Sequence, residues 1–279
     1  YNRKCMNKKR IRKEGFNMKK FLSMTLIAAM TLSLAACGGS SKEADSTKAD
    51  GSSTKKYVIA TDTVFAPFEF TNESNDFVGI DVDILSAIAE DQGFEYELSP
   101  LGFDAAVASL ESGQSDAVIA GMSITDERKE KYDFSEAYYD SYVCMATAAD
   151  SNIKGYEDLK GKTVAAKTGT QGAECAESLK DKYDFDVQYF DESSLMYQDV
   201  ITGNSAACFE DQPVMAYGIT QGNGLKIIAE EQESFSTPYG FAVLKGQNAE
   251  LLEMFNKGLA NIIDNGTYKE IVAKYTDAE

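Results

Sequence analysis

The chain has 279 residues, of which 43% are hydrophobic and 26% charged, enough for one large globular unit or for two lobes with separate cores. It contains no histidine, which excludes catalytic triads and metal sites that depend on imidazole. From residue 37 onward it carries 18 basic and 44 acidic side chains, and so acidic a surface argues against nucleic acid and anionic lipid headgroups as partners.

The N-terminal segment has the pattern of a secretory signal. Lys19 and Lys20 precede an apolar run over residues 21–36 that ends in small residues. An uncleaved anchor helix is the alternative, but the run is short for a membrane span. We therefore predict a signal peptide over residues 1–36, with a basic extension upstream of Met18.

Cysteine 37 follows this run directly. The tetrapeptide Leu-Ala-Ala-Cys37 resembles the lipobox of bacterial lipoproteins, which implies cleavage before Cys37 and attachment of lipid to it. Residues 37–56 are rich in Gly, Ser and charge and predict a flexible tether. The later cysteines, Cys144, Cys175 and Cys208, are odd in number and widely spaced, so we interpret them as buried apolar residues and not as disulfides or zinc ligands.

From residue 57 onward, short apolar runs alternate with helical patterns. Strands are predicted over residues 57–61, 94–98 and 117–120, with helices over 80–92 and 105–110 between them. This β-α-β-α-β order predicts a parallel sheet covered by helices.

A second series follows the first with the same order. Its predicted strands and helices lie over residues 163–166, 173–183, 187–190, 195–202 and 205–209. An amphipathic helix over residues 251–263 follows, and Thr267 with Glu270 forms a capping-box pattern for a last helix. Two similar α/β lobes are the natural interpretation, and one continuous doubly wound sheet is the alternative.

One strand end has the features of a carboxylate receptor. Gly121 and Ser123 follow the apolar strand, Thr125 can cap a helix that starts at Asp126, and Arg128 lies one turn into that helix. Free backbone N–H groups and a guanidinium suit a carboxylate. The alternative is an ordinary capped surface helix.

Polar residues follow the other predicted strands as well. Glu210 and Asp211 come directly after 205–209 and suit an ammonium group, while Asp62 follows the first strand. The turn 167–171 follows another strand, but it lacks the spacing of a phosphate-binding loop. Each signal also fits a plain strand-to-helix turn. Their shared position at strand ends, where α/β proteins bind ligands, favours one site.

Several segments carry a family resemblance. They are Tyr57-Val-Ile-Ala-Thr-Asp-Thr-Val-Phe-Ala-Pro-Phe-Glu-Phe70, Phe77-Val-Gly-Ile-Asp-Val-Asp83, residues 121–128, and Tyr132-Asp-Phe-Ser135. The chain resembles the polar amino-acid-binding proteins of bacterial ABC importers (solute-binding protein family 3), and within them it is nearest to the glutamine-binding group.

The resemblance implies an α/β, two-lobed type II periplasmic-binding-protein fold with two crossovers and a ligand cleft between the lobes. Lobe 1 is expected over residues 57–141 and 236–279, and lobe 2 over 142–235. The crossovers are expected near residues 142–143 and 234–239.

The resemblance also implies roles for individual residues. Arg128 is expected to hold the α-carboxylate of the ligand, with Ser123 and the backbone at Gly121, and Asp211 its α-ammonium. Phe65 and Phe103 are expected to sandwich the ligand side chain, with Asp62 and Lys167 at its tip. The other residues implied at the ligand site are Ala120, Thr170, Gln171 and Glu210.

The side-chain pocket favours glutamine. Asp62 offers an acceptor and Lys167 a donor, and a neutral amide satisfies both. Two residues depart from the glutamine-binding pattern: Glu210 stands where that group has histidine, and Gln171 replaces a glycine and is familiar from basic-amino-acid binders. A binder of arginine, lysine or histidine is therefore one alternative. A cyclohexadienyl-type dehydratase on the same scaffold, with Glu210 as its acid, is another.

The expected partners follow from this interpretation. They are a free amino acid, an ABC permease, and the membrane through lipid at Cys37, which places the protein at the outer face of the cell membrane. We expect a monomer that is not an enzyme and uses no cofactor, no metal and no nucleic acid. A receptor that only signals is the remaining alternative.

Overall fold

The computed structural model describes residues 55–276, except for the side chains of residues 232 and 233. The predicted signal peptide, Cys37 and nearly all of the predicted tether lie outside the described residues. Within the described part, no helix is long and apolar enough to cross a membrane.

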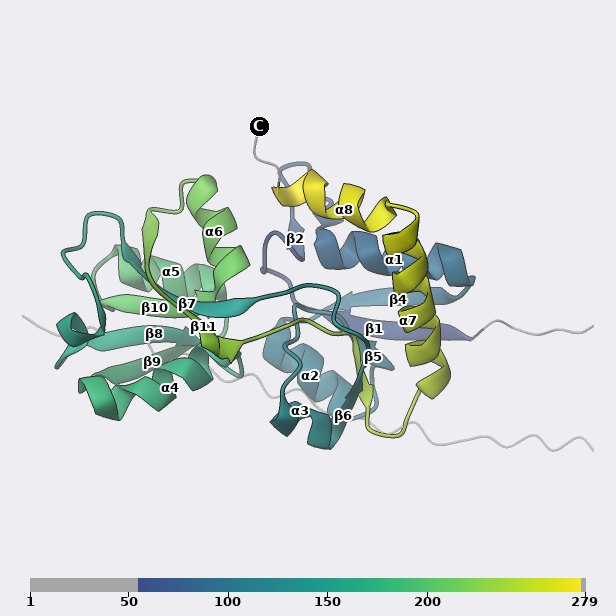
Figure 1. The fold of residues 1–279 in the computed structure, drawn as a ribbon, viewed down its shortest axis with the longest axis horizontal. Coiled ribbons are helices and arrows are strands. Elements are labelled where there is room, and N and C mark those ends of the chain that lie inside the picture. The colour runs from purple at the N-terminus through teal and green to yellow at the C-terminus, as the bar shows by residue number, and fades with distance from the viewer. Residues whose placement is uncertain (1–54, 277–279) are drawn as a thin grey trace, which may run out of the picture. The chain divides into compact units, whose positions relative to one another are not determined.

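Two five-stranded sheets form the fold, as Figure 1 shows. The first has the order β4-β1-β5-β12-β6, and the second β11-β7-β10-β8-β9. The first comprises β1 (Lys56–Thr61), β4 (Glu95–Pro100), β5 (Ala117–Val118), β6 (Tyr132–Phe134) and β12 (Ala242–Leu244). The second comprises β7 (Tyr142–Ala148), β8 (Thr163–Lys167), β9 (Asp186–Phe190), β10 (Ala207–Asp211) and β11 (Leu225–Ser236). The two-lobed α/β fold is confirmed, and the single continuous sheet is excluded.

Each sheet has a parallel centre and antiparallel additions. Strands β4, β1 and β5 are parallel to one another, as are β9, β8 and β10, which confirms the two predicted series. The antiparallel strands β7, β11 and β12 were not predicted. The first sheet takes strands from both ends of the chain and the second only from its middle, which supports the proposed division into lobes at residues 57–141, 142–235 and 236–279.

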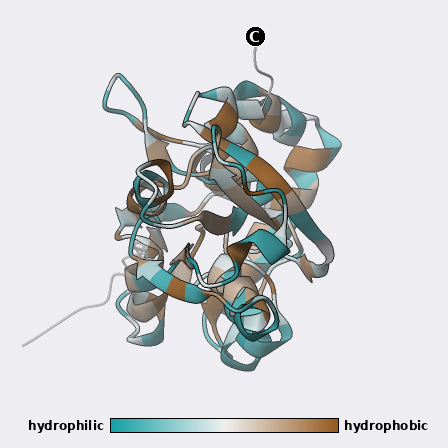
Figure 2. Cartoon of the chain, turned by 90° about the vertical axis from the view of Figure 1, so that its left-hand side faces the viewer, coloured by the Kyte–Doolittle hydropathy of each residue, from teal (hydrophilic) through white to brown (hydrophobic). Residues whose placement is uncertain are grey.

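Helices cover both sheets, and Figure 2 shows them banded in teal and brown, as amphipathic helices are. Beside the first sheet lie α1 (Ile80–Gln92), α2 (Phe103–Glu111), α3 (Asp126–Lys131), α7 (Ala249–Asp264) and α8 (Thr267–Thr276). Beside the second lie α4 (Gln171–Tyr183), α5 (Ser193–Ile201) and α6 (Gln212–Thr220), together with the 3₁₀ helix η1 (Tyr156–Leu159). The short ladder β2 (Phe70–Thr71) with β3 (Phe77–Val78) completes the elements.

Helix α1 illustrates how the sequence specifies its helices. Its residues Ile84, Leu85 and Ile88 recur every three or four positions and are fully buried. It ends at Gly93, which adopts the left-handed conformation and donates its N–H to the carbonyl of Ala89. Against this face packs α7, whose Gly258 lies so close that an added Cβ would stand 2.7 Å from Ile88 Cγ2.

The two crossovers run side by side between the lobes (Figure 1). The first leads into β7 at Tyr142, and the second leaves β11 at Ser236. Backbone hydrogen bonds join them, from Thr237 N to Ser141 O at 2.7 Å and from Tyr239 N to Tyr139 O at 2.8 Å. Because both connections are paired with each other, they form a continuous two-stranded link.

The three described cysteines are free and buried, as predicted. Cys144 and Cys208 pack in one core cluster of the second lobe and Cys175 in another. Burial raises the pKa of Cys175 to about 12 and raises those of the other two as well, so all three are unreactive thiols that fill the core.

Candidate ligand-binding site

A small pocket lies where strand ends of the two sheets meet. Asp62 follows β1 directly, Ala120 and Gly121 follow β5, and Lys167 and Asp211 are the last residues of β8 and β10. The carboxyl ends of parallel strands are where open α/β sheets bind ligands. The structure places Asp62, Lys167 and Asp211 in the lining of this one pocket.

The lining of the pocket includes nearly every residue implied at the site. It consists of Asp62, Phe65, Phe103, Ala120, Gly121, Ser123, Arg128, Lys167, Thr170, Gln171 and Asp211. Glu210 is absent from this lining. A second hollow lies within the second lobe, and its charged lining residues, Asp150 and Lys162, are exposed.

Arg128 is positioned by the short helix α3. Thr125 caps this helix as predicted, because its side-chain oxygen accepts the Arg128 N–H at 3.2 Å. The guanidinium donates to Ser123 O and, across the cleft, to Gly169 O, both at 3.0 Å. It also lies 5.5 Å from the ring centroid of Phe103. A fixed cation at the junction of both lobes results.

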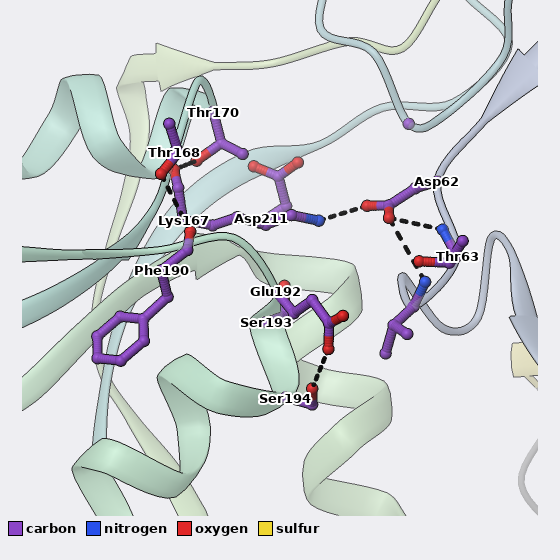
Figure 3. A network of polar contacts seen from close by, with 12 residues as sticks. Asp62, Thr63, Lys167, Thr168, Thr170, Phe190, Glu192, Ser193, Ser194 and Asp211 are labelled. Atoms are coloured by element: carbon purple, nitrogen blue, oxygen red, sulfur yellow. Dashed lines mark hydrogen bonds and ion pairs between the residues drawn. The ribbon is translucent and has the colours of Figure 1, made fainter. Parts of the chain in front are cut away.

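Lys167 and Asp62 form an ion pair between the lobes (Figure 3). Their exposures are only 2% and 3%, so the pair is out of water. Asp62 also accepts the N–H of Thr63 at 2.6 Å. The ammonium of Lys167 lies between two aromatic rings, 5.1 Å from the centroid of Phe65 and 5.9 Å from that of Phe103. A donor and an acceptor thus stand at one end of an aromatic slot.

Asp211 is the buried acid of the pocket. Its Oδ2 accepts the hydroxyl of Tyr239 at 2.6 Å, and the residue is 6% exposed. Burial and the neighbouring charge of Glu210 raise the pKa of Asp211 to about 7, while the Tyr239 hydrogen bond and the cations Arg128 and Lys167 oppose this rise. A cationic group of a ligand would stabilise its charged form.

Glu210 points to the other side of β10. Its carboxylate accepts hydrogen bonds from the hydroxyls of Ser193 at 2.7 Å and Tyr197 at 2.9 Å, and from the Asp211 N–H at 2.9 Å. Successive residues of a strand face opposite sides, so only one of two adjacent acids can face the pocket. Glu210 therefore does not line the pocket, and its charge acts there on the carboxyl of Asp211.

The turn 167–170 brings the second lobe to the pocket. Thr170 caps α4, with its hydroxyl accepting the Ala173 N–H at 3.3 Å and donating to Lys167 O at 2.8 Å. Gly169 has a φ of +74°, a conformation that favours glycine, and presents the carbonyl that Arg128 reaches. Gln171 is buried at the start of α4, and its side-chain nitrogen has no partner among the described residues.

Sequence reasoning missed three residues around the pocket. Tyr239, which is fully buried, donates its hydroxyl to Asp211. Glu69 and Asp81 are also fully buried; the backbone carbonyl of Glu69 accepts the N–H of Phe65, and the carboxylate of Asp81 accepts that of Gly121. A signal for Asp81 was present: it lies in register with Ile84, Leu85 and Ile88 on the apolar face of α1, where a carboxylate is unusual. Among residues 55–276, no group of potential ligands forms a metal site.

The sequence and the fold are similar to those of known proteins. The model of the bacterial extracellular solute-binding proteins, family 3, matches residues 57–278. The arginine-binding extracellular protein ArtP of Bacillus subtilis is 32% identical over 269 residues, 94% of this chain and 100% of that protein.

Two solved structures are also similar. Substrate-binding domain 2 of Lactococcus lactis GlnP, in an open conformation, is 43% identical with a TM-score of 0.56, and the match covers 80% of this chain and 96% of that one. The arginine-, lysine-, histidine-binding protein ArtJ of Geobacillus stearothermophilus is 35% identical with a TM-score of 0.73, over 81% and 96% of the two chains.

Proposed function

The chain belongs to family 3 of the bacterial extracellular solute-binding proteins, and from that premise we propose that it binds a free polar L-amino acid, with glutamine as its preferred ligand, and delivers it to an ABC permease. The observation that carries the proposal is the charge pattern of the pocket. Arg128 and Asp211 supply one cation and one anion for the two charges of an amino acid. The ion pair Lys167–Asp62 stands apart from them at the aromatic slot.

The ion pair supports an amide side chain over a charged one. Because Lys167 already balances Asp62, a cationic or anionic side chain would add an uncompensated buried charge, whose desolvation is costly. An amide adds no charge and offers both a donor and an acceptor. The unpartnered side-chain nitrogen of Gln171 can donate to an amide oxygen, which a lysine or arginine side chain lacks.

A basic amino acid is the second candidate ligand. It is supported by the names of the relatives, which include binders of arginine, histidine and lysine/arginine/ornithine. The carboxylates of Asp62, Asp211 and Glu210 also outnumber the cations Arg128 and Lys167 in and behind the pocket. A dehydratase activity has less support, because Glu210, its candidate acid, is turned away from the pocket.

A thermal-shift screen of the purified protein against all twenty amino acids tests the proposal, with calorimetry for each hit. A ligand at a hundred times its Kd is expected to stabilise the folded protein by about 2.7 kcal/mol, which raises Tm by several degrees. The largest shift is expected with glutamine. A largest shift with arginine, lysine or histidine would establish the second candidate, and no shift with any amino acid would overturn the proposal.

Ligand affinity is expected to depend on the charge of Asp211. Since burial raises the pKa of Asp211 to about 7, its carboxyl is protonated in much of the free protein below that pH, and an α-ammonium can bind only after the proton leaves. Kd is therefore expected to rise by up to about tenfold per pH unit below pH 7.

Calorimetry from about pH 5 to about pH 8 checks this dependence. Asp211→Asn should bind weakly and lose the acid dependence. An unchanged profile in that variant would contradict the assignment of the ammonium to Asp211.

The location of the protein is proposed as well. We propose that Cys37 carries lipid and anchors the domain at the outer face of the cell membrane through residues 38–56. Metabolic labelling with a fatty-acid analogue should mark the protein and should not mark a Cys37→Ser variant. Equal labelling of both proteins would contradict the proposal that the lipid is attached to Cys37.

A further inference from the structure

Two acidic side chains are buried together behind the pocket, where the proposed function does not use them. Glu69 lies directly before β2, and Asp81 lies in the first turn of α1. Both are 0% exposed. Neither lines the pocket, and neither forms an ion pair with a lysine or arginine among residues 55–276.

The hydrogen bonds of the two carboxyls are unequal. Asp81 Oδ2 accepts the N–H of Gly121 and the hydroxyl of Tyr138, both at 2.8 Å. Asp81 Oδ1 and both oxygens of Glu69 have no partner from any other described residue. The two carboxyls are neighbours, because the charge of Asp81 contributes to raising the pKa of Glu69. Two neighbouring buried carboxyls without a cation between them do not both ionise, and one proton held between them pairs Asp81 Oδ1 with one of the two Glu69 oxygens.

The surroundings identify Glu69 as the side chain that holds the proton. Asp81 already accepts two hydrogen bonds that stabilise a negative charge, and Glu69 accepts none. Burial, with the nearby carboxylates Asp81 and Asp62, raises the pKa of Glu69 well above its ordinary value, and only the charge of Lys167 opposes this. Burial raises the pKa of Asp81 to about 6 against its hydrogen bonds from Gly121, Tyr138 and Glu69.

Asp81 holds a part of the pocket wall. Gly121 has a φ of +53°, and a Cβ there would stand 2.4 Å from Cε1 of Phe65 and 3.3 Å from Cε2 of Tyr239. By accepting the hydrogen bond of the Gly121 N–H, Asp81 holds a left-handed backbone that favours glycine, packed against two aromatic rings of the site. The other partner, Tyr138, donates its backbone N–H to Tyr239 O at 2.9 Å, and Tyr239 in turn holds Asp211.

We propose that Glu69 and Asp81 form a carboxylic acid–carboxylate pair whose shared proton keeps the Gly121 peptide in place for the amino-acid ligand, so that both are positioning residues and ligand affinity depends on that proton. This proposal rests on the proposed function. When the proton leaves, two adjacent buried negative charges repel each other, and the support of Gly121 and Tyr138 is lost.

The direction of the pH effect follows from linkage. A carboxyl with a raised pKa in the folded state contributes its stability fully below its unfolded pKa, and that contribution is lost as the pH rises through the folded pKa. Both Tm and ligand affinity should therefore fall on the alkaline side. Glutamine at position 69 donates an N–H to Asp81 without titrating, so it mimics the protonated acid.

The decisive variant is Glu69→Gln, compared with the wild type by calorimetry and thermal unfolding from about pH 6 to about pH 10. At neutral pH its Kd should stay within about twofold of the wild-type value. Its alkaline loss of affinity should be absent and its alkaline loss of Tm smaller than in the wild type, because only the titration of Asp211 and Asp81 remains. Glu69→Leu, which cannot donate, should weaken binding about tenfold or more at neutral pH. Glu73→Gln, an exposed acid of the same segment, is the matched control and should behave as the wild type.

Infrared spectroscopy of the wild type supplies a readout that does not depend on binding. At about pH 8, above the pKa of Asp211, the difference between the wild-type and Glu69→Gln spectra should contain the carbonyl stretch of one protonated carboxyl group. An alkaline decline in Glu69→Gln equal to that of the wild type, with binding intact, would overturn the proton-sharing pair alone. If the wild type binds no amino acid at any pH, the proposed function and the positioning role fall together, and the infrared band and the Tm profile still decide whether the proton is shared.

Discussion

Replacing Arg128 by alanine is expected to weaken the binding of every amino acid by about a thousandfold or more, equivalent to about 4 kcal/mol. Arg128 is the only arginine after residue 12, and it is the cation that meets both lobes through Ser123 O and Gly169 O. All amino acids share the α-carboxylate, so the loss should not depend on the side chain. Truncating one partner of a buried, hydrogen-bonded charge pair leaves the other charge unpaired, which accounts for the size of the effect.

Two comparisons make this result specific. Arg128→Lys keeps the charge but loses the planar fork of donors, so an intermediate loss is expected. Lys129→Ala removes the next cation of α3, which is exposed and bound only to Asp126 at 3.3 Å, and should leave Kd unchanged. Calorimetry with glutamine and arginine measures all three variants. Tight binding of amino acids by Arg128→Ala would contradict the assignment of Arg128 as the residue that binds the α-carboxylate.

Replacing Lys167 by methionine is expected to reverse the ranking of ligands. The variant leaves Asp62 buried without its counter-ion, at a cost of about 3–5 kcal/mol to the free protein. A lysine, ornithine or arginine side chain in the aromatic slot can restore that charge balance. The affinity for these ligands relative to glutamine should rise by about a hundredfold or more, since 2.7 kcal/mol corresponds to that ratio.

The reciprocal variant completes the test. Asp62→Asn leaves Lys167 without its carboxylate and should favour glutamate over glutamine. Competition calorimetry with the four ligands gives the ranking of each variant, and Lys162→Met, an exposed lysine of the same lobe, serves as the control. The same ranking in Lys167→Met as in the wild type would show that the ion pair does not set the specificity.

Much of the fold follows from local patterns. The periodicity of residues 80–92 gave the bounds of α1, and the apolar runs at 57–61 and 163–166 gave the parallel strands β1 and β8. The antiparallel strands escaped prediction for physical reasons. Three-residue β12 is too short to show a period, and β11 mixes polar and apolar residues because its pairing with β7 is irregular. Only long-range pairing stabilises such strands.

The site shows the same division. Residues at strand ends could be named in advance because the carboxyl ends of parallel strands meet at one edge of a sheet. The contact between Lys167 and Asp62 joins residues 105 positions apart, and its burial was not foreseeable. The sequence does not predict a role for Glu69 and Asp81, because such a role depends on tertiary contacts, such as those of Asp81 with Gly121 and Tyr138.

The sequence by itself determined the class of the protein, the order of its two α/β series and the charged residues at their strand ends, since composition, periodicity and dense motifs are local properties. The tertiary structure alone decided which of these charges meet. Adjacent acids in β10 illustrate the difference: Asp211 faces the pocket and Tyr239, whereas Glu210 faces Ser193 and Tyr197. A strand alternates its side chains, but which side becomes a ligand site depends on what packs against each face.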